Sequence, residues 1–122
     1  MKIDFDKNKP IYLQILDDVK NQLVSGKLKA NQRLPSIRDL ADELEVTPNT
    51  IQRVYRELES EKLSYTERGT GSYITQDPDV IENLKQALIR EEVIRFHEQM
   101  QQFGLTDDQI FQQIKKYTEG RE

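Results

Sequence analysis

The sequence predicts a mainly α-helical fold of the α+β class, in which amphipathic helices accompany one short β-hairpin. Two observations indicate the helices: apolar residues recur every three or four positions over five segments, and residues typical of helix ends flank most of them. A third indicates the hairpin, because the period changes to alternation between residues 63 and 76, around two glycines. A length of 122 residues fits one domain with a small appendage.

The first predicted helix covers residues 10–25. Pro10 suits its first turn, where a missing N–H group costs nothing, and Gly26 is favourable just past its end. The apolar positions that recur at helical spacing are Tyr12, Ile15, Leu16, Val19 and Leu23. We therefore expect this helix to bury one face, and a polar link to follow it.

A second, short helix is predicted over residues 36–43. Ser36 and Asp39 stand three positions apart, which is the spacing of a capped helix start. The apolar positions of this segment are Ile37, Leu40, Ala41 and Leu44. They share one face, on which Ala41 is small enough for a neighbouring helix to approach closely.

The third predicted helix covers residues 47–61 and begins unusually, with a proline in the run "VTPNTIQRVYREL". Thr47 suits the N-cap position, where its hydroxyl accepts the backbone N–H of Thr50. Pro48 then occupies the first helical position, so it opens the helix instead of breaking it. Val46 and Ile51 are spaced as a hydrophobic staple. The apolar stripe consists of Ile51, Val54, Tyr55 and Leu58.

The predicted hairpin lies within residues 63–76, "LSYTERGTGSYITQ". Apolar and polar residues alternate at Leu63 and Tyr65, and less clearly at Tyr73 and Thr75. The run "ERGTG" between them supplies two glycines for a tight reversal. It lacks the GK[ST] ending of a nucleotide-binding loop, so we interpret it as a turn.

After Asp77 we expect a second region, which gives domains at residues 1–77 and 78–122. A long helix is predicted over residues 79–103, and Gly104 ends it. Thr106 and Gln109 form a second capping-box pattern before a final helix that runs to about Thr118. The apolar positions predicted to form a dimer interface are Ile89, Val93, Phe96, Met100, Phe103, Ile110 and Ile114. Two helices alone make a poor core, so we favour a homodimer over packing within one chain.

A helix, a helix-turn-helix and a hairpin, in that order, describe a winged helix-turn-helix. If the apolar stripe of the third helix faces inward, its outer face carries the donor-rich side chains Asn49, Gln52, Arg53 and Arg56. No acidic residue lies between Thr47 and Arg56, whereas three glutamates follow. Such a face suits base edges and phosphates of double-stranded DNA. The alternative for Arg53 is an exposed ion pair with Glu57, four residues further on.

The run "LPSIRDLADELEVTPNTIQRVYRELESEKL", followed by "ERGTGSYI", resembles the DNA-binding domain of the GntR family of bacterial transcription regulators. The resemblance covers residues 9–76, and the short C-terminal part resembles the YtrA-type branch, whose appendage mainly dimerises. It implies DNA contacts from Arg38, Thr47, Asn49, Thr50, Gln52, Arg68 and Gly69. Arg53 and Arg56 join this set because they share the outer face.

Three positions depart from the family pattern. The family usually has glycine where this chain has Glu45, and a left-handed glutamate there costs roughly 1 kcal/mol. It often has arginine at the position of Pro48 and a basic residue at Gln52. These two differences bear on the target sequence and on the affinity for DNA.

Composition bounds the remaining classes of function. The net charge of -4 lies in residues 77–122, with 6 basic and 10 acidic residues, whereas residues 1–76 carry 12 of each. Cysteine is absent and His97 is the only histidine, so we expect no zinc site, no metal and no cofactor. No signal peptide and no apolar run of about 20 residues is present, which predicts a cytoplasmic protein with no membrane partner.

The sequence thus predicts a sequence-specific DNA-binding regulator, most simply a homodimeric repressor of an inverted-repeat operator. A winged helix that serves as a protein-interaction module is the alternative. An enzyme is disfavoured because no catalytic arrangement of residues is recognisable. A possible small-molecule effector and the target genes stay open.

Overall fold

The computed structural model describes residues 1–121, which divide into two compact units. The first unit is Met1–Lys85 and the second begins at Gln86. The division therefore falls inside a helix, beyond the change of composition at Asp77 and Pro78.

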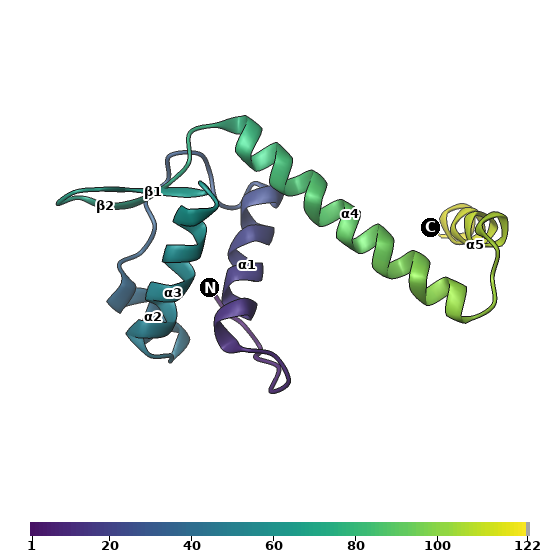
Figure 1. The fold of residues 1–122 in the computed structure, drawn as a ribbon, viewed down its shortest axis with the longest axis horizontal. Coiled ribbons are helices and arrows are strands. Elements are labelled where there is room, and N and C mark those ends of the chain that lie inside the picture. Colours follow the sequence, from purple (N-terminus) through teal and green to yellow (C-terminus); the bar gives the residue numbers. More distant parts are fainter. Residues whose placement is uncertain (122) are drawn as a thin grey trace. The chain divides into compact units, whose positions relative to one another are not determined.

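Three helices form the body of the first unit (Figure 1): α1 (Ile11–Ser25), α2 (Ile37–Leu44) and α3 (Pro48–Ser60). α3 packs against both α1 and α2. The apolar stripes predicted for the three helices are confirmed as its core; side chains that are almost completely buried include Ile15, Val19, Leu40, Ala41, Ile51, Val54 and Leu58. α1 begins one residue later than predicted, with Pro10 at the N-cap and Gly26 left-handed after its end.

The joint between α2 and α3 follows the predicted pattern with one exception. Ser36 caps α2 by accepting the N–H of Asp39 at 3.1 Å, and Pro48 is the first residue of α3. The predicted cap from the Thr47 hydroxyl is wrong, because the Thr50 N–H donates to the Thr47 carbonyl at 3.1 Å instead. The Thr47 hydroxyl lies 3.0 Å from the Thr50 hydroxyl. The Thr47 carbonyl therefore accepts the Thr50 N–H, which the Thr47 hydroxyl was expected to accept.

A buried tyrosine ties α3 to the segment that precedes α2. The Tyr55 hydroxyl donates to the Pro35 carbonyl at 2.6 Å. Burial raises the pKa of this phenol well above its usual value, and the Glu43 carboxylate adds to the effect. The hydroxyl therefore keeps its proton, and with it the hydrogen bond, at all ordinary pH values.

The hairpin consists of β1 (Ser64–Glu67) and β2 (Gly71–Ile74), and Figure 1 shows it extending away from the three helices. The strands are antiparallel, and buried Leu63 and Ile74 anchor their base to the core. The polar link also pairs with the hairpin, because Leu34 N–H donates to the Ser72 carbonyl and Ile74 N–H to the Gln32 carbonyl, each at 2.8 Å. The predicted hairpin is confirmed, and we call it the wing (residues 64–74).

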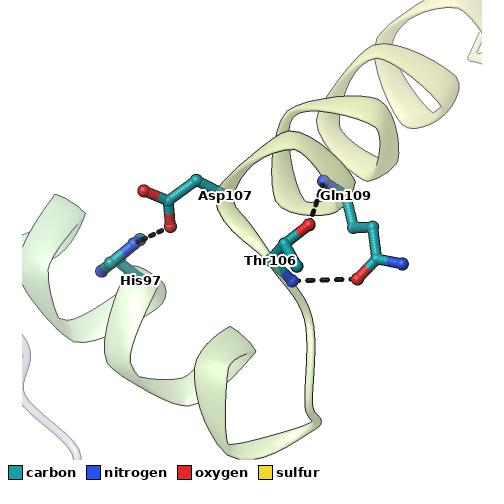
Figure 2. Close-up of polar contacts among 4 residues, drawn as sticks. All are labelled: His97, Thr106, Asp107 and Gln109. Carbon is teal, nitrogen blue, oxygen red and sulfur yellow. Dashed lines mark hydrogen bonds and ion pairs between the residues drawn. The ribbon is translucent and has the colours of Figure 1, made fainter.

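The second unit contains most of α4 (Pro78–Gln102) and α5 (Asp107–Gly120). Figure 2 shows the turn that joins them. The predicted capping box is confirmed: the Thr106 hydroxyl accepts the Gln109 N–H at 3.3 Å, and the Gln109 side chain accepts the Thr106 N–H at 2.9 Å. A ring nitrogen of His97 lies 2.7 Å from the Asp107 carboxylate, which links the two helices.

Candidate nucleic-acid interface

The outer face of α3 points to solvent, as the sequence predicted. Asn49, Gln52, Arg53 and Arg56 are all exposed, while the opposite face of the helix is buried. The first turn of α3 carries no acidic residue. The helix therefore presents amide and guanidinium donors, together with the unpaired backbone N–H groups of its first turn.

The wing borders this face on one side. Gln52 and Arg56 line a shallow hollow of about 290 Å³ together with Thr66 and Ser72 from the two strands. Side chains of α3 and of the wing thus share one surface. Thr66 and Ser72 were not among the predicted site residues, because alternation along a strand does not show which of its faces adjoins a helix.

Helix α1 borders the same face on the other side. Asn49, Thr50 and Arg53 line a second shallow hollow, of about 380 Å³, with Ile11 and Tyr12. The guanidinium carbon of Arg53 lies 3.5 Å from the centroid of the Tyr12 ring, which is a cation–π contact. The alternative ion pair between Arg53 and Glu57 is not formed in the structure of residues 1–121.

Four further predicted positions lie at the start of α3, on α2 and at the turn of the wing. Thr47 is exposed at the start of α3, and Arg38 is exposed on α2. Arg68 and Gly69 are exposed at the turn of the wing, where Gly69 has φ +85°. Within residues 1–121, no ion pair engages Arg38, Arg56 or Arg68. Their positive charges are therefore available to a partner.

One arginine beside the wing was not predicted from the sequence. A Cβ atom placed on Gly71 would lie 3.1 Å from Nε of Arg33, so the Arg33 side chain lies close to the backbone of the wing at Gly71. Arg33 also forms an isolated bridge with Tyr73. Only the pairing of the polar link with β2 brings Arg33 there, and nothing in the spacing of its neighbours indicates that pairing.

The acidic residues of α3 lie in its second half, where Glu59 lines the hollow on the wing side together with Gln52 and Arg56. Glu57, Glu59 and Glu61 follow at the far end of α3, and Glu61 pairs with Lys20 of α1 at 3.0 Å. No group of three or more possible metal ligands occurs among the described residues. Nor does any described helix have the length and apolar character needed to cross a bilayer.

Comparison with known proteins adds independent information. Residues 11–74 match the family described as "Bacterial regulatory proteins, gntR family". The chain is 41% identical to the uncharacterized HTH-type transcriptional regulator YhcF of Bacillus subtilis, over 98% of this chain and 99% of YhcF. It is 36% identical to the HTH-type transcriptional repressor YtrA of Bacillus subtilis, over 84% of this chain and 74% of YtrA.

The fold is similar to solved structures as well. A GntR family transcriptional regulator from Listeria monocytogenes superposes with a TM-score of 0.86 at 41% identity, covering 92% of this chain and 98% of that one. The match covers the C-terminal helices as well as the winged unit. Sequence and structure together show that this chain belongs to the GntR family of bacterial regulatory proteins, in its YtrA-type branch.

Proposed function

We propose that the protein is a homodimeric transcriptional repressor that binds an inverted-repeat operator through α3 and the wing. One observation carries this proposal: residues 48–56 of α3 expose donor side chains with no acidic residue among them, and Arg38, Arg56 and Arg68 form no ion pair within residues 1–121. The relative YtrA, at 36% identity, is itself named a repressor. A regulator of this kind acts on DNA in the cytoplasm.

Each part of the surface has a distinct role in this proposal. The exposed amides of Asn49 and Gln52, in the first half of α3, are suited to the edges of adenine bases in the major groove. Arg38 and Arg68 are suited to phosphates on either side of the groove, which fix the position of the protein along the duplex. The acidic end of α3 stays outside the groove, since a carboxylate facing phosphate is repelled.

The second unit supports the dimer. Large apolar side chains are exposed there, among them Val93 (58%) and Phe103 (76%), and clusters of such side chains mark interaction sites. Five other predicted interface positions belong to the same two helices: Ile89, Phe96, Met100, Ile110 and Ile114. Ile110 differs from the rest because it is only 3% exposed and already buried within its own chain. A two-fold dimer places its half-sites about 34 Å apart, or one helical turn of DNA.

The proposal is tested by selecting bound sequences from random duplexes and then measuring affinities for the selected operator. Arg38→Ala and Arg68→Ala are each expected to weaken operator binding by about tenfold, because each removes a phosphate contact. Lys116→Ala, which removes an equal charge from α5, is the matched control and is expected to bind like the wild type.

Two outcomes contradict the proposal. If both arginine variants bind the operator like the wild type, the assigned surface is wrong. If no sequence is enriched at low salt, the winged unit is a protein-interaction module and not a reader of DNA.

A further inference from the structure

We infer that Tyr12 is a positioning residue for DNA binding, which holds the Arg53 guanidinium on the α1 side of α3 so that it contacts phosphate and not a base edge. The inference rests on the proposed function and deepens it, because it assigns a role to a residue outside the helix-turn-helix. It also separates Arg53 from the other donors on the face of α3.

The stacking geometry carries the first step. With its guanidinium carbon 3.5 Å from the ring centroid, Arg53 lies over the face of Tyr12. A guanidinium that stacks through its flat face keeps its N–H donors free, because these lie in its plane. Within residues 1–121, Arg53 has no ion pair that would compete for them. The group is therefore fixed in place and still able to bind two oxygens of one phosphate.

The position of Arg53 on the helix carries the second step. Gln52 and Arg56 line the hollow on the wing side, whereas Asn49, Arg53 and Tyr12 line the hollow on the α1 side, where the Arg53 guanidinium lies over the Tyr12 ring. A helix with its side chains is about 10–12 Å wide and the major groove about 12 Å, so a long side chain that is held against a neighbouring helix beside α3 meets a groove wall. Those walls are the sugar–phosphate backbones. Stacking on α1 also holds the guanidinium away from the floor of the groove, where the base edges lie.

Pre-organisation explains why a tyrosine serves here. A free arginine side chain occupies many rotamers, and binding must order them. A ring on a neighbouring helix orders Arg53 before the DNA arrives, so less is lost on binding. The hydroxyl of Tyr12 has no part in this role, which distinguishes it from a tyrosine that itself donates to phosphate.

The test measures affinity for the operator and for a non-operator duplex across a salt series. Arg53→Gln is expected to weaken both complexes by a similar factor, near tenfold, and to reduce the salt slope by about one, as loss of a phosphate contact does. Tyr12→Leu, which keeps an apolar side chain without a ring face, is expected to weaken both complexes several-fold. Tyr12→Phe keeps the ring and is expected to match the wild type.

The double variant Tyr12→Leu/Arg53→Gln separates positioning from a structural role. If Tyr12 acts through Arg53, the double variant binds no more weakly than Arg53→Gln alone. Independent, additive losses overturn the positioning role, and so does a loss of affinity in Tyr12→Phe. If Arg53→Gln changes the base preference and leaves the salt slope unchanged, the assignment of Arg53 to phosphate is wrong. This measurement uses the single variant and requires no change at Tyr12.

The wild-type protein supplies the remaining control. If it binds no DNA, the proposed function itself fails. If it binds its operator and Tyr12→Leu binds equally well, the proposed function stands and the inference about Tyr12 fails.

Discussion

At the scale of single residues, the turn of the helix-turn-helix holds a glutamate in a conformation that favours glycine. Glu45 follows α2 with φ 57° and ψ 44°, and its N–H closes the helix by bonding to the carbonyls of Ala41 and Asp42. The left-handed region brings Cβ close to the following carbonyl oxygen, which costs roughly 1 kcal/mol for residues other than glycine. Glu45 therefore adopts the left-handed conformation considered for it from the sequence, and the cost of that conformation applies.

Glu45→Gly is expected to raise the free energy of unfolding by up to about 1 kcal/mol, because it removes this strain. Urea denaturation followed by circular dichroism measures the change. Glu57→Gly is the matched control, since it makes the same exchange at an exposed position with ordinary helical backbone. The control is expected to lose roughly 0.5–1 kcal/mol. Equal losses in both variants would show that Glu45 is unstrained.

Residue chemistry at the helix ends was largely predictable. Ser36, Pro48 and the pair Thr106 and Gln109 act over three or four positions, and their bonds depend on little beyond the local chain. Thr47 is the N-cap residue of α3 as predicted, but the bond to its hydroxyl was predicted incorrectly, because two local bonds of similar strength compete for the Thr50 N–H. Sequence spacing does not decide between a side-chain acceptor and a backbone acceptor three residues away.

At the scale of elements, the wing depends on a glycine that faces an arginine. Gly71 has φ +129°, and a Cβ there would lie 3.1 Å from Nε and 3.3 Å from a terminal nitrogen of Arg33. Gly69, two positions earlier, has φ +85° and open space around it. Both glycines satisfy the backbone of the turn, but Gly71 also leaves room for the link that pairs with β2.

Gly71→Ala is therefore expected to destabilise the protein more than Gly69→Ala. The latter carries a backbone cost of about 1 kcal/mol, whereas Gly71 at φ +129° carries a larger backbone cost and also requires the Arg33 side chain to move. Urea unfolding of both variants measures the difference. Adding Arg33→Ala to Gly71→Ala is expected to recover only the part that comes from the contact with Arg33, and full recovery would contradict the backbone explanation.

The helices and the hairpin were predictable from the sequence, but the contacts between them were not. Helix α3 and the hairpin follow from local periodicity and from the glycines of the turn. The pairing of Gln32 and Leu34 with β2 joins residues about forty positions apart and leaves no alternation in the link. Tyr12 was assigned to the apolar stripe of α1, which hid its contact with Arg53 in α3.

At the scale of the whole molecule, candidate DNA-contacting groups and exposed apolar surface are divided between the two units. The winged unit carries Arg38, Arg56 and Arg68 and the donor side chains of α3, and the second unit carries most of the large exposed apolar side chains. This division suits a protein that meets DNA with one unit and another copy of itself with the other.

Val93→Glu is expected to weaken self-association by a hundredfold or more, on the order of 3 kcal/mol, because it buries an unpaired carboxylate in the interface. Val93 is 58% exposed in the single chain, so the fold of each subunit tolerates the change. Sedimentation equilibrium measures the shift from dimer to monomer. Gln99→Glu adds the same charge at another exposed position of α4 and is expected to leave the mass unchanged. An unchanged mass in Val93→Glu would contradict the proposed interface.

The turn between α4 and α5 has a kinetic consequence. Its bonds join residues close in the chain: His97 with Asp107, Met100 with Leu105, and Thr106 with Gln109. Contacts of such short range form within microseconds, well before distant segments meet. When the full chain refolds, this corner can therefore form early, without waiting for the sheet pairing that the winged unit requires.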